Sequence, residues 1–178
     1  ATLSTLTGKG VQGGSTLTQQ LIKQIYFSDE VASENRGGIQ RKIKELILAL
    51  ELEKKYSKDD ILFMYLNQSP YGGRRNGVES AAETYFKKTV KDLNLAECAL
   101  LAAIPNNPSM YNPYNEYFND ALIERQHKVL NDMVDMGAIT SQEAEDAKNY
   151  DILATIQPES SQYANMKAPH FVLEVKKQ

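Results

Sequence analysis

Cysteine and histidine are scarce in this 178-residue chain, and long apolar runs are missing. The single cysteine, Cys98, excludes an internal disulfide, and its apolar surroundings at residues 95–104 predict a small buried side chain. His127 and His170 have no cysteine or acidic partner at metal-ligand spacing, so a zinc site is not expected. No stretch approaches the roughly 20 apolar residues that span a bilayer. No signal peptide is visible and the chain begins with Ala1, which favours part of a longer protein.

The charge balance limits the kinds of partner that the chain can have. Its formal net charge is -3 at pH 7, whereas affinity for a phosphate backbone needs an excess of lysine and arginine, so we expect no nucleic-acid partner. A small basic pocket is still compatible with this total. The sequence contains neither a phosphate-loop nor a dinucleotide-binding fingerprint. With 42% hydrophobic residues the chain can form one substantial core.

Helical periodicity recurs along the chain, whereas strand patterns are weak, so the predicted fold class is all-α or mainly α. The helix at about 39–56 is expected to be the most buried, because residues 46–52 are almost all apolar. We predict a domain over residues 1–150 and a linker over 151–178. The remaining helices are expected after the N-cap Ser15, from 57 to 66, from 79 to 86, from Asn94 to Pro105, from 119 to 136 and after Thr140.

The first candidate motif is Gly13-Gly-Ser-Thr-Leu-Thr-Gln-Gln-Leu-Ile-Lys23. Two glycines before a helix let backbone N–H groups approach a ligand closely, and the helix N-terminus favours an anion. Thr16, Gln20 and Lys23 share one helical face, with Gln19 adjoining Lys23. Such a face can hold a phosphate or a sugar, although a solvated helix face explains the same residues.

The second candidate motif is Arg41-Lys-Ile-Lys-Glu45. Glu45 follows Lys42 by three residues and Arg41 by four, so the three side chains can meet on one helix. A carboxylate beside two cations can be catalytic or can orient a phosphate-binding pair. A structural ion pair is the alternative interpretation.

Two loops complete the set of candidates. Arg74 and Arg75 lie in the glycine-rich loop at 71–77, and solvated loop charges are the alternative interpretation of both. Asn106 and Asn107 open a second loop, where asparagines commonly form turns.

Four ordered motifs over residues 13–113 resemble those of one enzyme family, the peptidoglycan glycosyltransferase domain (glycosyltransferase family 51) of bifunctional class A penicillin-binding proteins. Residues 13–23 match the family's Gly-Gly-Ser-Thr-x-Thr-Gln-Gln-x-x-Lys pattern at every fixed position, and residues 41–45 with Ala49 and 52–53 resemble the next motif. The third and fourth motifs are similar at Ile61-Leu62, Tyr65-Leu-Asn67, Tyr71-Gly72, Gly77-Val-Glu79, Ala81-Ala82, Tyr85-Phe86, Leu95-Ala-Glu-Cys-Ala-Leu-Leu-Ala102, Pro105, Pro108-Ser109 and Tyr111-Asn-Pro113. Ala168-Pro-His-Phe171 resembles the link into a transpeptidase domain, which is absent from this chain.

The resemblance implies a lysozyme-like fold and a polymerising reaction. The donor is a glycan on undecaprenyl pyrophosphate, and the acceptor is lipid II, whose sugar 4-hydroxyl displaces the lipid pyrophosphate with inversion. Carried over from the family, Glu45 is the catalytic carboxylate of this chain, and it orients the cations or a bound divalent ion. The residues implied to bind substrate are Gly13, Ser15, Gln19, Gln20, Lys23, Arg36, Arg41, Lys42 and Asn106.

The same resemblance implies the setting in which the enzyme works. Its partners are lipid II, the growing glycan strand, the membrane surface and a transpeptidase domain in the parent chain. It acts at the extracytoplasmic face of the bacterial cell membrane. No cofactor is required, and a divalent cation, Mg²⁺ or Mn²⁺, is compatible with the pyrophosphate.

Two departures from the family pattern affect these expectations. The family's first motif, Glu-Asp-x-x-Phe-x-x-His, is not in this chain, and its glutamate is the expected general base for the acceptor hydroxyl. We therefore expect the chain by itself to be inactive. Arg36 lies five residues before Arg41, whereas the family has an arginine four residues before it. Two other functions remain open, a hydrolytic or lytic muramidase and a non-catalytic module that binds lipid II or glycan.

Overall fold

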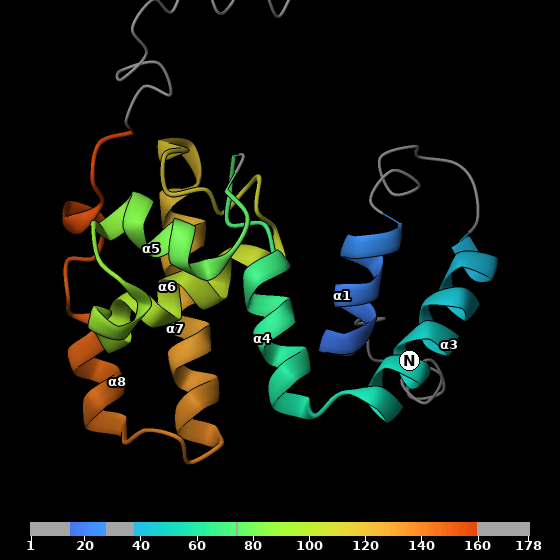
Figure 1. Cartoon of the computed structure of the whole chain (residues 1–178). Coiled ribbons are helices and arrows are strands. Elements are labelled where there is room, and N and C mark those ends of the chain that lie inside the picture. Colours follow the sequence, from blue (N-terminus) through green and yellow to red (C-terminus); the bar gives the residue numbers. More distant parts are fainter. Residues whose placement is uncertain (1–14, 28–37, 74, 160–178) are drawn as a thin grey trace, which may run out of the picture.

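The described part of the chain is built from helices and short loops (Figure 1). The computed structural model describes residues 15–27, 38–73 and 75–159, and in these ranges it contains no strand, only an isolated antiparallel bridge between Pro70 and Asn76. The α-helices are α1 (Leu17–Tyr26), α3 (Gly38–Lys55), α4 (Lys58–Gln68), α5 (Val78–Phe86), α6 (Leu95–Ala103), α7 (Asn119–Asp135) and α8 (Ser141–Lys148). Short 3₁₀ turns lie at Val90–Asp92, Ile104–Asn106, Glu116–Phe118 and Leu153–Thr155. The predicted mainly α fold class is confirmed.

Local sequence signals set most of the helix boundaries. Ser57, Asn94 and Thr140 each accept a hydrogen bond from a backbone N–H three residues later, and the side chain at that position bonds back to the cap. These capping boxes satisfy donors that a helix start would leave unpaired. Gly137 follows α7 with a φ of 71°, a backbone conformation that glycine adopts without strain.

The start of α1 differs from the prediction by one residue. The N-cap is Thr16, whose hydroxyl accepts from the backbone N–H of Gln19 at 3.2 Å. The hydroxyl of Ser15 accepts a hydrogen bond from Lys42 Nζ instead. Ser15 is therefore available to join α1 to α3, because capping is left to its neighbour.

Most of the core lies among α5, α6, α7 and α8, which form one lobe of the molecule (Figure 1). Small side chains on α5 and α6 let these helices approach closely, and larger apolar side chains fill the remaining space. The fully buried members include Ala81, Ala82, Tyr85, Leu100, Ala103, Ile104, Leu122 and Leu130.

The other lobe is thinner and consists of α1, α3 and α4, with α4 lying between α1 and the core helices (Figure 1). Helix α1 packs against both α3 and α4. Two small apolar clusters hold it there, and half-buried Leu52 of α3 touches both. Their buried members are Leu21, Ile61 and Tyr65 in one cluster and Ile22, Phe27 and Ala49 in the other.

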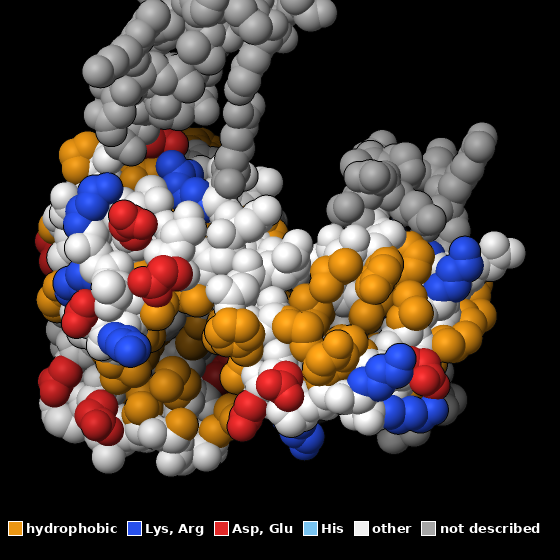
Figure 2. Space-filling model, in the orientation of Figure 1, with side chains coloured by type: hydrophobic (Ala, Val, Ile, Leu, Met, Phe, Trp, Pro, Cys, Tyr) orange, Lys and Arg blue, Asp and Glu red, His pale blue; other side chains and the backbone are white. Residues whose placement is uncertain are grey.

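The prediction that the helix at 39–56 is the most buried is wrong. Helix α3 buries only Glu45 and Ala49, whereas Ile39, Ile43 and Ile47 stay at least half exposed. The physical reason is that α1 is the one described helix against which α3 packs extensively, and a single neighbour covers a single face. Figure 2 shows hydrophobic side chains gathered on the surface of this lobe. Within the described ranges, no helix is long and apolar enough to cross a membrane.

The expected burial of Cys98 is also wrong, since its side chain is exposed. Helix α6 buries Ala96, Ala99, Leu100 and Ala103 against the core. Cys98 lies on the opposite stripe of the same helix. An apolar sequence run therefore did not identify the covered face.

The loop between α4 and α5 is fixed by glycine geometry and by one arginine. Gly77 has a φ of 88°, and a Cβ there would lie 2.9 Å from the carbonyl oxygen of Asn67, so a larger residue would disturb the turn. The guanidinium of Arg75 lies over the rings of Tyr85 and Tyr114, at 5.4 and 4.9 Å from their centroids. It also pairs with Glu159 at 2.8 Å. The alternative that Arg75 is a solvated loop charge is therefore wrong, and Arg74 lies outside the described residues.

Hydrogen bonds hold the segment at 157–159 against the same two tyrosines, Tyr85 and Tyr114. The backbone N–H of Gln157 donates to the Tyr85 carbonyl at 2.8 Å, and the hydroxyl of Tyr114 donates to the Gln157 carbonyl at 3.0 Å. Burial raises the pKa of Tyr85 to about 12, although the nearby charge of Arg75 acts to lower this pKa. The phenol therefore stays neutral, and its hydroxyl donates a hydrogen bond to the Tyr71 carbonyl. Arg75 thus joins the α4–α5 loop to the last described segment.

We predict that Arg75→Ala loosens this segment without unfolding the domain. Losing two cation–π contacts and one half-exposed ion pair should lower the free energy of unfolding by about 1–2 kcal/mol. Urea unfolding measures this change, and limited proteolysis should show faster cleavage near residue 158. Lys91→Ala, which removes an exposed cation from the same lobe, is the matched control. Identical unfolding and cleavage for Arg75→Ala and the control would contradict the prediction.

Candidate active site

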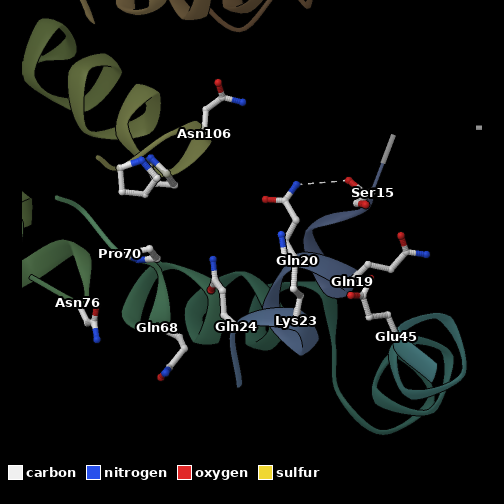
Figure 3. Close-up of a pocket in the computed structure, with 12 residues that line it drawn as sticks. Ser15, Gln19, Gln20, Lys23, Gln24, Glu45, Gln68, Pro70, Asn76 and Asn106 are labelled. Atoms are coloured by element: carbon white, nitrogen blue, oxygen red, sulfur yellow. Dashed lines mark hydrogen bonds between the residues drawn. The ribbon is translucent and has the colours of Figure 1, made fainter. Parts of the chain in front are cut away.

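A cavity of about 650 Å³ lies between the two lobes (Figure 3). One wall comes from α1 and α3, the floor from α1 and α4, and the opposite wall from the loops that follow α4 and α6. The lining residues are Ser15, Gln19, Gln20, Lys23, Gln24, Glu45, Gln68, Pro70, Asn76, Pro105, Asn106 and Pro108. Most of these lining residues have polar or charged side chains, and among the described residues the cations near the cavity belong to α1 and α3.

A buried carboxylate organises that charged end. Glu45 is only 1% exposed, so its charge needs close partners to offset the loss of solvation. Lys42 Nζ donates to Glu45 Oε2 at 2.9 Å and also to the hydroxyl of Ser15 at 2.6 Å. Arg41 Nε lies 3.3 Å from Glu45 Oε1. One carboxylate therefore holds two cations, and one of these reaches across to the start of α1.

The pairing between Arg41 and Glu45 is close but poorly aligned. Arg41 Nε and Glu45 Oε1 are both buried, and neither forms a hydrogen bond with another described residue. The 3.3 Å contact between them is thus an ion pair without hydrogen-bond geometry. A buried polar atom left without a hydrogen bond is uncommon in folded proteins. One hydrogen-bond donor and one acceptor at this buried ion pair are therefore not used by any described residue.

Lys23 supplies a third cation from α1. Its side chain is exposed and lines the same cavity as Glu45 (Figure 3). The positions of α1 and α3 are linked by Thr18, which is buried and donates to Glu53 at 2.5 Å. Lys23 of α1 and Glu45 of α3 thus line one cavity, and Arg41 and Lys42 contact the Glu45 carboxylate.

A row of amides continues along the cavity floor. Gln20 and Gln24 are four residues apart on α1, and Tyr65 and Ser69 are four residues apart at α4. The hydroxyl of Tyr65 donates to Gln20 Oε1 at 3.3 Å, and Gln24 Nε2 donates to Ser69 Oγ at 3.4 Å. Gln20 Nε2 also donates to the Ser15 carbonyl at 3.4 Å (Figure 3). The packing of α1 on α4 therefore orients both amides.

The structure brings together most of the residues expected from the sequence. Ser15, Gln19, Gln20, Lys23, Glu45 and Asn106 line the cavity, with Asn106 on the far wall (Figure 3). Arg41 and Lys42 are not among the lining residues, and both contact the carboxylate of Glu45. Gly13 and Arg36 lie outside the described residues.

Sequence reasoning missed three amides and three prolines of the lining. Gln24 had a usable signal, since it follows Gln20 by one helical turn on the face that was already proposed to bind ligand. Gln68 and Asn76 gave no such signal, because each lies at the edge of a loop whose path depends on packing. The missed lining residues are Gln24, Gln68, Pro70, Asn76, Pro105 and Pro108.

The described residues do not form a metal site. No group of three or more histidine, cysteine, aspartate or glutamate side chains lies together within the described ranges. Glu45 is the one carboxylate among the lining residues, and both its oxygens lie next to cations. A divalent ion would therefore meet positive charge here rather than a set of oxygen ligands.

Comparison with known proteins identifies the family. Residues 1–134 match the family described as transglycosylase. The chain belongs to the transglycosylase family. Penicillin-binding protein 1A of Clostridium botulinum (strain Langeland) is 46% identical over 133 residues, which cover 73% of this chain and 15% of that protein. Penicillin-binding protein 1A of Streptococcus oralis is 40% identical over 171 residues, covering 96% of this chain and 26% of that protein.

The fold of this transglycosylase chain also has a solved counterpart. The crystal structure of penicillin-binding protein 1A from Haemophilus influenzae is similar with a TM-score of 0.52 and 24% identity, covering 89% of this chain and 19% of that one. The expected resemblance to glycosyltransferase family 51 and the lysozyme-like fold are confirmed. The chain spans about a quarter or less of the length of these penicillin-binding proteins.

We predict that Lys42→Met destabilises the transglycosylase lobe formed by α1, α3 and α4. The substitution removes a hydrogen bond to Ser15. It also leaves the buried Glu45 with Arg41 as its remaining ion-pair partner, in a contact that lacks hydrogen-bond geometry. Because Lys42 is half exposed, the loss should be about 1–2 kcal/mol in the free energy of unfolding. Chemical denaturation measures this loss. The control is Lys44→Met, since Lys44 is exposed on the same helix and forms no ion pair within the described ranges. Equal stability of the two variants would show that Lys42 does not hold the lobe together.

Proposed function

We propose that this chain is the polymerising part of a peptidoglycan glycosyltransferase, which joins lipid II units into β-1,4 glycan strands and releases undecaprenyl pyrophosphate. The observation that carries the proposal is the charged end of the cavity. There Lys23 lines the same space as Glu45, which holds Arg41 and Lys42 beside it. The chain as a whole is acidic, so this local excess of cations marks a site for an anion.

The chemistry of the reaction explains why cations are needed. The 4-hydroxyl oxygen of the acceptor sugar forms a bond to the anomeric carbon of the donor, while the bond from that carbon to the pyrophosphate oxygen breaks. Negative charge grows on the leaving pyrophosphate as this bond lengthens. Lys23, Arg41 and Lys42 would stabilise that charge in the transition state more than in the ground state, which is the requirement for catalysis.

In this proposal Glu45 is a catalytic carboxylate of the leaving-group side. Its two oxygens hold Lys42 and Arg41 close together, although these cations repel each other. An arriving pyrophosphate would take charge-assisted hydrogen bonds from Lys23 and from the two cations beside Glu45. Ser15, Gln19, Gln20 and Asn106 would add neutral hydrogen bonds around the substrate.

The acceptor hydroxyl must lose its proton to a base, and this chain does not supply one in the proposed scheme. The family's base belongs to a Glu-Asp-x-x-Phe-x-x-His motif, and no such pattern occurs in the 178 residues. Glu45 is engaged by two cations on the donor side, so it does not take this part. A muramidase mechanism is disfavoured for a related reason. Such enzymes use a pair of carboxylates around the scissile bond, and Glu45 is the one carboxylate among the described lining residues.

The proposed setting is the extracytoplasmic face of the bacterial membrane. Both substrates carry a lipid. Apolar side chains lie exposed on α1 and α3, the same helices that form the charged end of the cavity (Figure 2). A large exposed apolar patch commonly marks an interaction surface, and we assign this one to the membrane surface. In the parent protein a transpeptidase domain would follow and cross-link the glycan product. A divalent cation, Mg²⁺ or Mn²⁺, would take its ligands from the pyrophosphate rather than from these side chains.

In a chain extended to include the first family motif, Lys23→Ala and Glu45→Gln should each reduce polymerisation by roughly 100-fold or more, because each removes part of the preorganised charge at the leaving group. The measurement is the rate of glycan-strand formation from purified lipid II. Circular dichroism of each variant should match the unmodified protein. Lys91→Ala, distant from the cavity lining, is the control and should polymerise normally. Activity within a few-fold of the control for Lys23→Ala would refute the assignment of the anion site.

The 178-residue chain by itself should form no glycan strands from lipid II, even when it is folded and binds ligand. A sugar hydroxyl is a poor nucleophile near neutral pH without a base within hydrogen-bond reach. The same polymerisation assay, run beside the extended chain, measures this difference. Robust polymer from the 178 residues would mean that the acceptor-side base lies among them, and the division of roles proposed here would be wrong.

A further inference from the structure

The loop after α4 contributes to the cavity through its two ends. Pro70 and Asn76 pair in the isolated antiparallel bridge, and both line the cavity (Figure 3). Inside this bridge the backbone N–H of Tyr71 donates to the carbonyl of Arg75 at 2.8 Å. Asn76 is the next residue along the chain, so an interaction that fixes Arg75 also limits where Asn76 can lie.

Arg75 and Asn76 are neighbours that face different surroundings. Asn76 lines the cavity, whereas Arg75 is not among the lining residues and only 16% of its side chain is exposed. The Arg75 guanidinium lies 5.4 Å from the ring centroid of Tyr85 and 4.9 Å from that of Tyr114. The core lobe therefore holds Arg75, and through the backbone it holds the adjacent part of the cavity wall.

The guanidinium also contacts its own loop. Arg75 Nη1 donates to the carbonyl of Gly72 at 3.5 Å, and a Cβ at Gly73 would lie 2.7 Å from the same nitrogen. A Cβ at Gly72 would lie 2.9 Å from the hydroxyl oxygen of Tyr85. Both glycines have positive φ values, which residues with a side chain rarely adopt. The path of the loop and the position of the guanidinium thus depend on each other.

A segment far along the chain completes the contacts of this guanidinium. Arg75 Nη2 pairs with Glu159 Oε1 at 2.8 Å. The backbone of Gln157 is hydrogen-bonded to Tyr85 and Tyr114, so the rings under the guanidinium and its carboxylate partner are held together. A planar guanidinium can stack on rings and pair with a carboxylate at the same time. One side chain therefore connects the segment at 157–159 with the cavity wall.

We propose that Arg75 is a positioning residue for the substrate cavity, which acts through Asn76, and that the segment at 157–159 influences the cavity through Arg75. Arg75 itself does not touch the substrate. The inference rests on the proposed function, because it concerns how the substrate of that reaction is held. Neither Arg75 nor Glu159 belongs to the motifs by which the chain resembles its family.

The kinetic test uses a chain extended to include the first family motif, and it measures kcat and KM for lipid II in the polymerisation assay. The variants are Arg75→Ala, Asn76→Ala, their combination, and Glu159→Gln. The control is Val129→Ala, which removes half-buried methyl groups of α7 from the same core and is not a lining residue. Thermal melting verifies that each variant is folded at the assay temperature.

The expected result is a change in KM. Arg75→Ala should raise KM by roughly threefold to tenfold and leave kcat within about twofold, because a displaced wall weakens binding of ground state and transition state alike. Glu159→Gln should raise KM less, by about twofold, since this ion pair is half exposed. The combined variant should have the KM of Asn76→Ala alone, because Arg75 then has no residue left to position. Val129→Ala should change neither constant.

A second measurement separates this inference from the proposed function. Hydrogen exchange of the Tyr71 amide in the 178-residue chain reports on the bridge without any substrate. Arg75→Ala should accelerate this exchange by roughly tenfold more than Val129→Ala does. If that acceleration occurs while the unmodified extended chain forms no polymer, Arg75 still holds the wall and the proposed function fails instead.

Three results would overturn the inference. The first is a KM for Arg75→Ala equal to that of Val129→Ala, which would reduce Arg75 to a stabilising contact. The second is a combined variant whose KM rises by the product of the two single effects, since Arg75 would then act independently of Asn76. The third is exchange of the Tyr71 amide that Arg75→Ala leaves unchanged.

Discussion

The buried carboxylate of Glu45 is the constraint on which the candidate site depends. A carboxylate that is 1% exposed loses most of its hydration, so it is tolerated only with cations at close range. Arg41 and Lys42 provide them from the preceding turn of α3. Lys42 also reaches Ser15, which fixes the beginning of α1 relative to α3. The ion cluster therefore fixes one end of α1, the helix that carries Gln19, Gln20 and Lys23, although none of these pairs with Glu45 directly.

The two lobes differ in how they are stabilised and in what they contribute to the cavity. Helices α5 to α8 bury a continuous core, whereas α1, α3 and α4 share only two small apolar clusters. Apolar burial is the main source of folding free energy, so the thin lobe has less of it and relies more on polar links such as Lys42 to Ser15 and Thr18 to Glu53. The cavity lies where the lobes meet. Its far wall is held by the well-packed lobe, while its charged end belongs to the thin one.

Charge placement, rather than total charge, distinguishes this cavity. The chain is acidic overall, yet Arg41 and Lys42 of α3 flank one carboxylate and Lys23 of α1 lines the same cavity. The other lining side chains that the structure describes carry no charge. A substrate with an anionic pyrophosphate joined to uncharged sugars has the same order of charge along its length. The arrangement would therefore orient such a substrate in one direction, because reversing it would place amides against phosphate and cations against sugar.

The sequence by itself determined the elements and the family. Capping boxes at Ser57, Asn94 and Thr140 fixed helix starts because their hydrogen bonds are local, and the motif at residues 13–23 pointed to the family that the comparisons established. The spacing of Arg41, Lys42 and Glu45 likewise indicated an ion cluster within one helix. These features depend on residues a few positions apart, so they can be read without knowing the fold.

Tertiary structure alone decided which faces are covered and what lines the cavity. Most large apolar residues of α3 and Cys98 of α6 were expected to be buried but are exposed, because burial depends on which helices pack alongside. Arg75 became an anchor only because Tyr85, Tyr114 and Glu159 converge on it from distant parts of the chain. Gln68 and Asn76 joined the cavity for the same reason. Contacts between residues far apart in sequence leave no periodic pattern, and so no local signal could have predicted them.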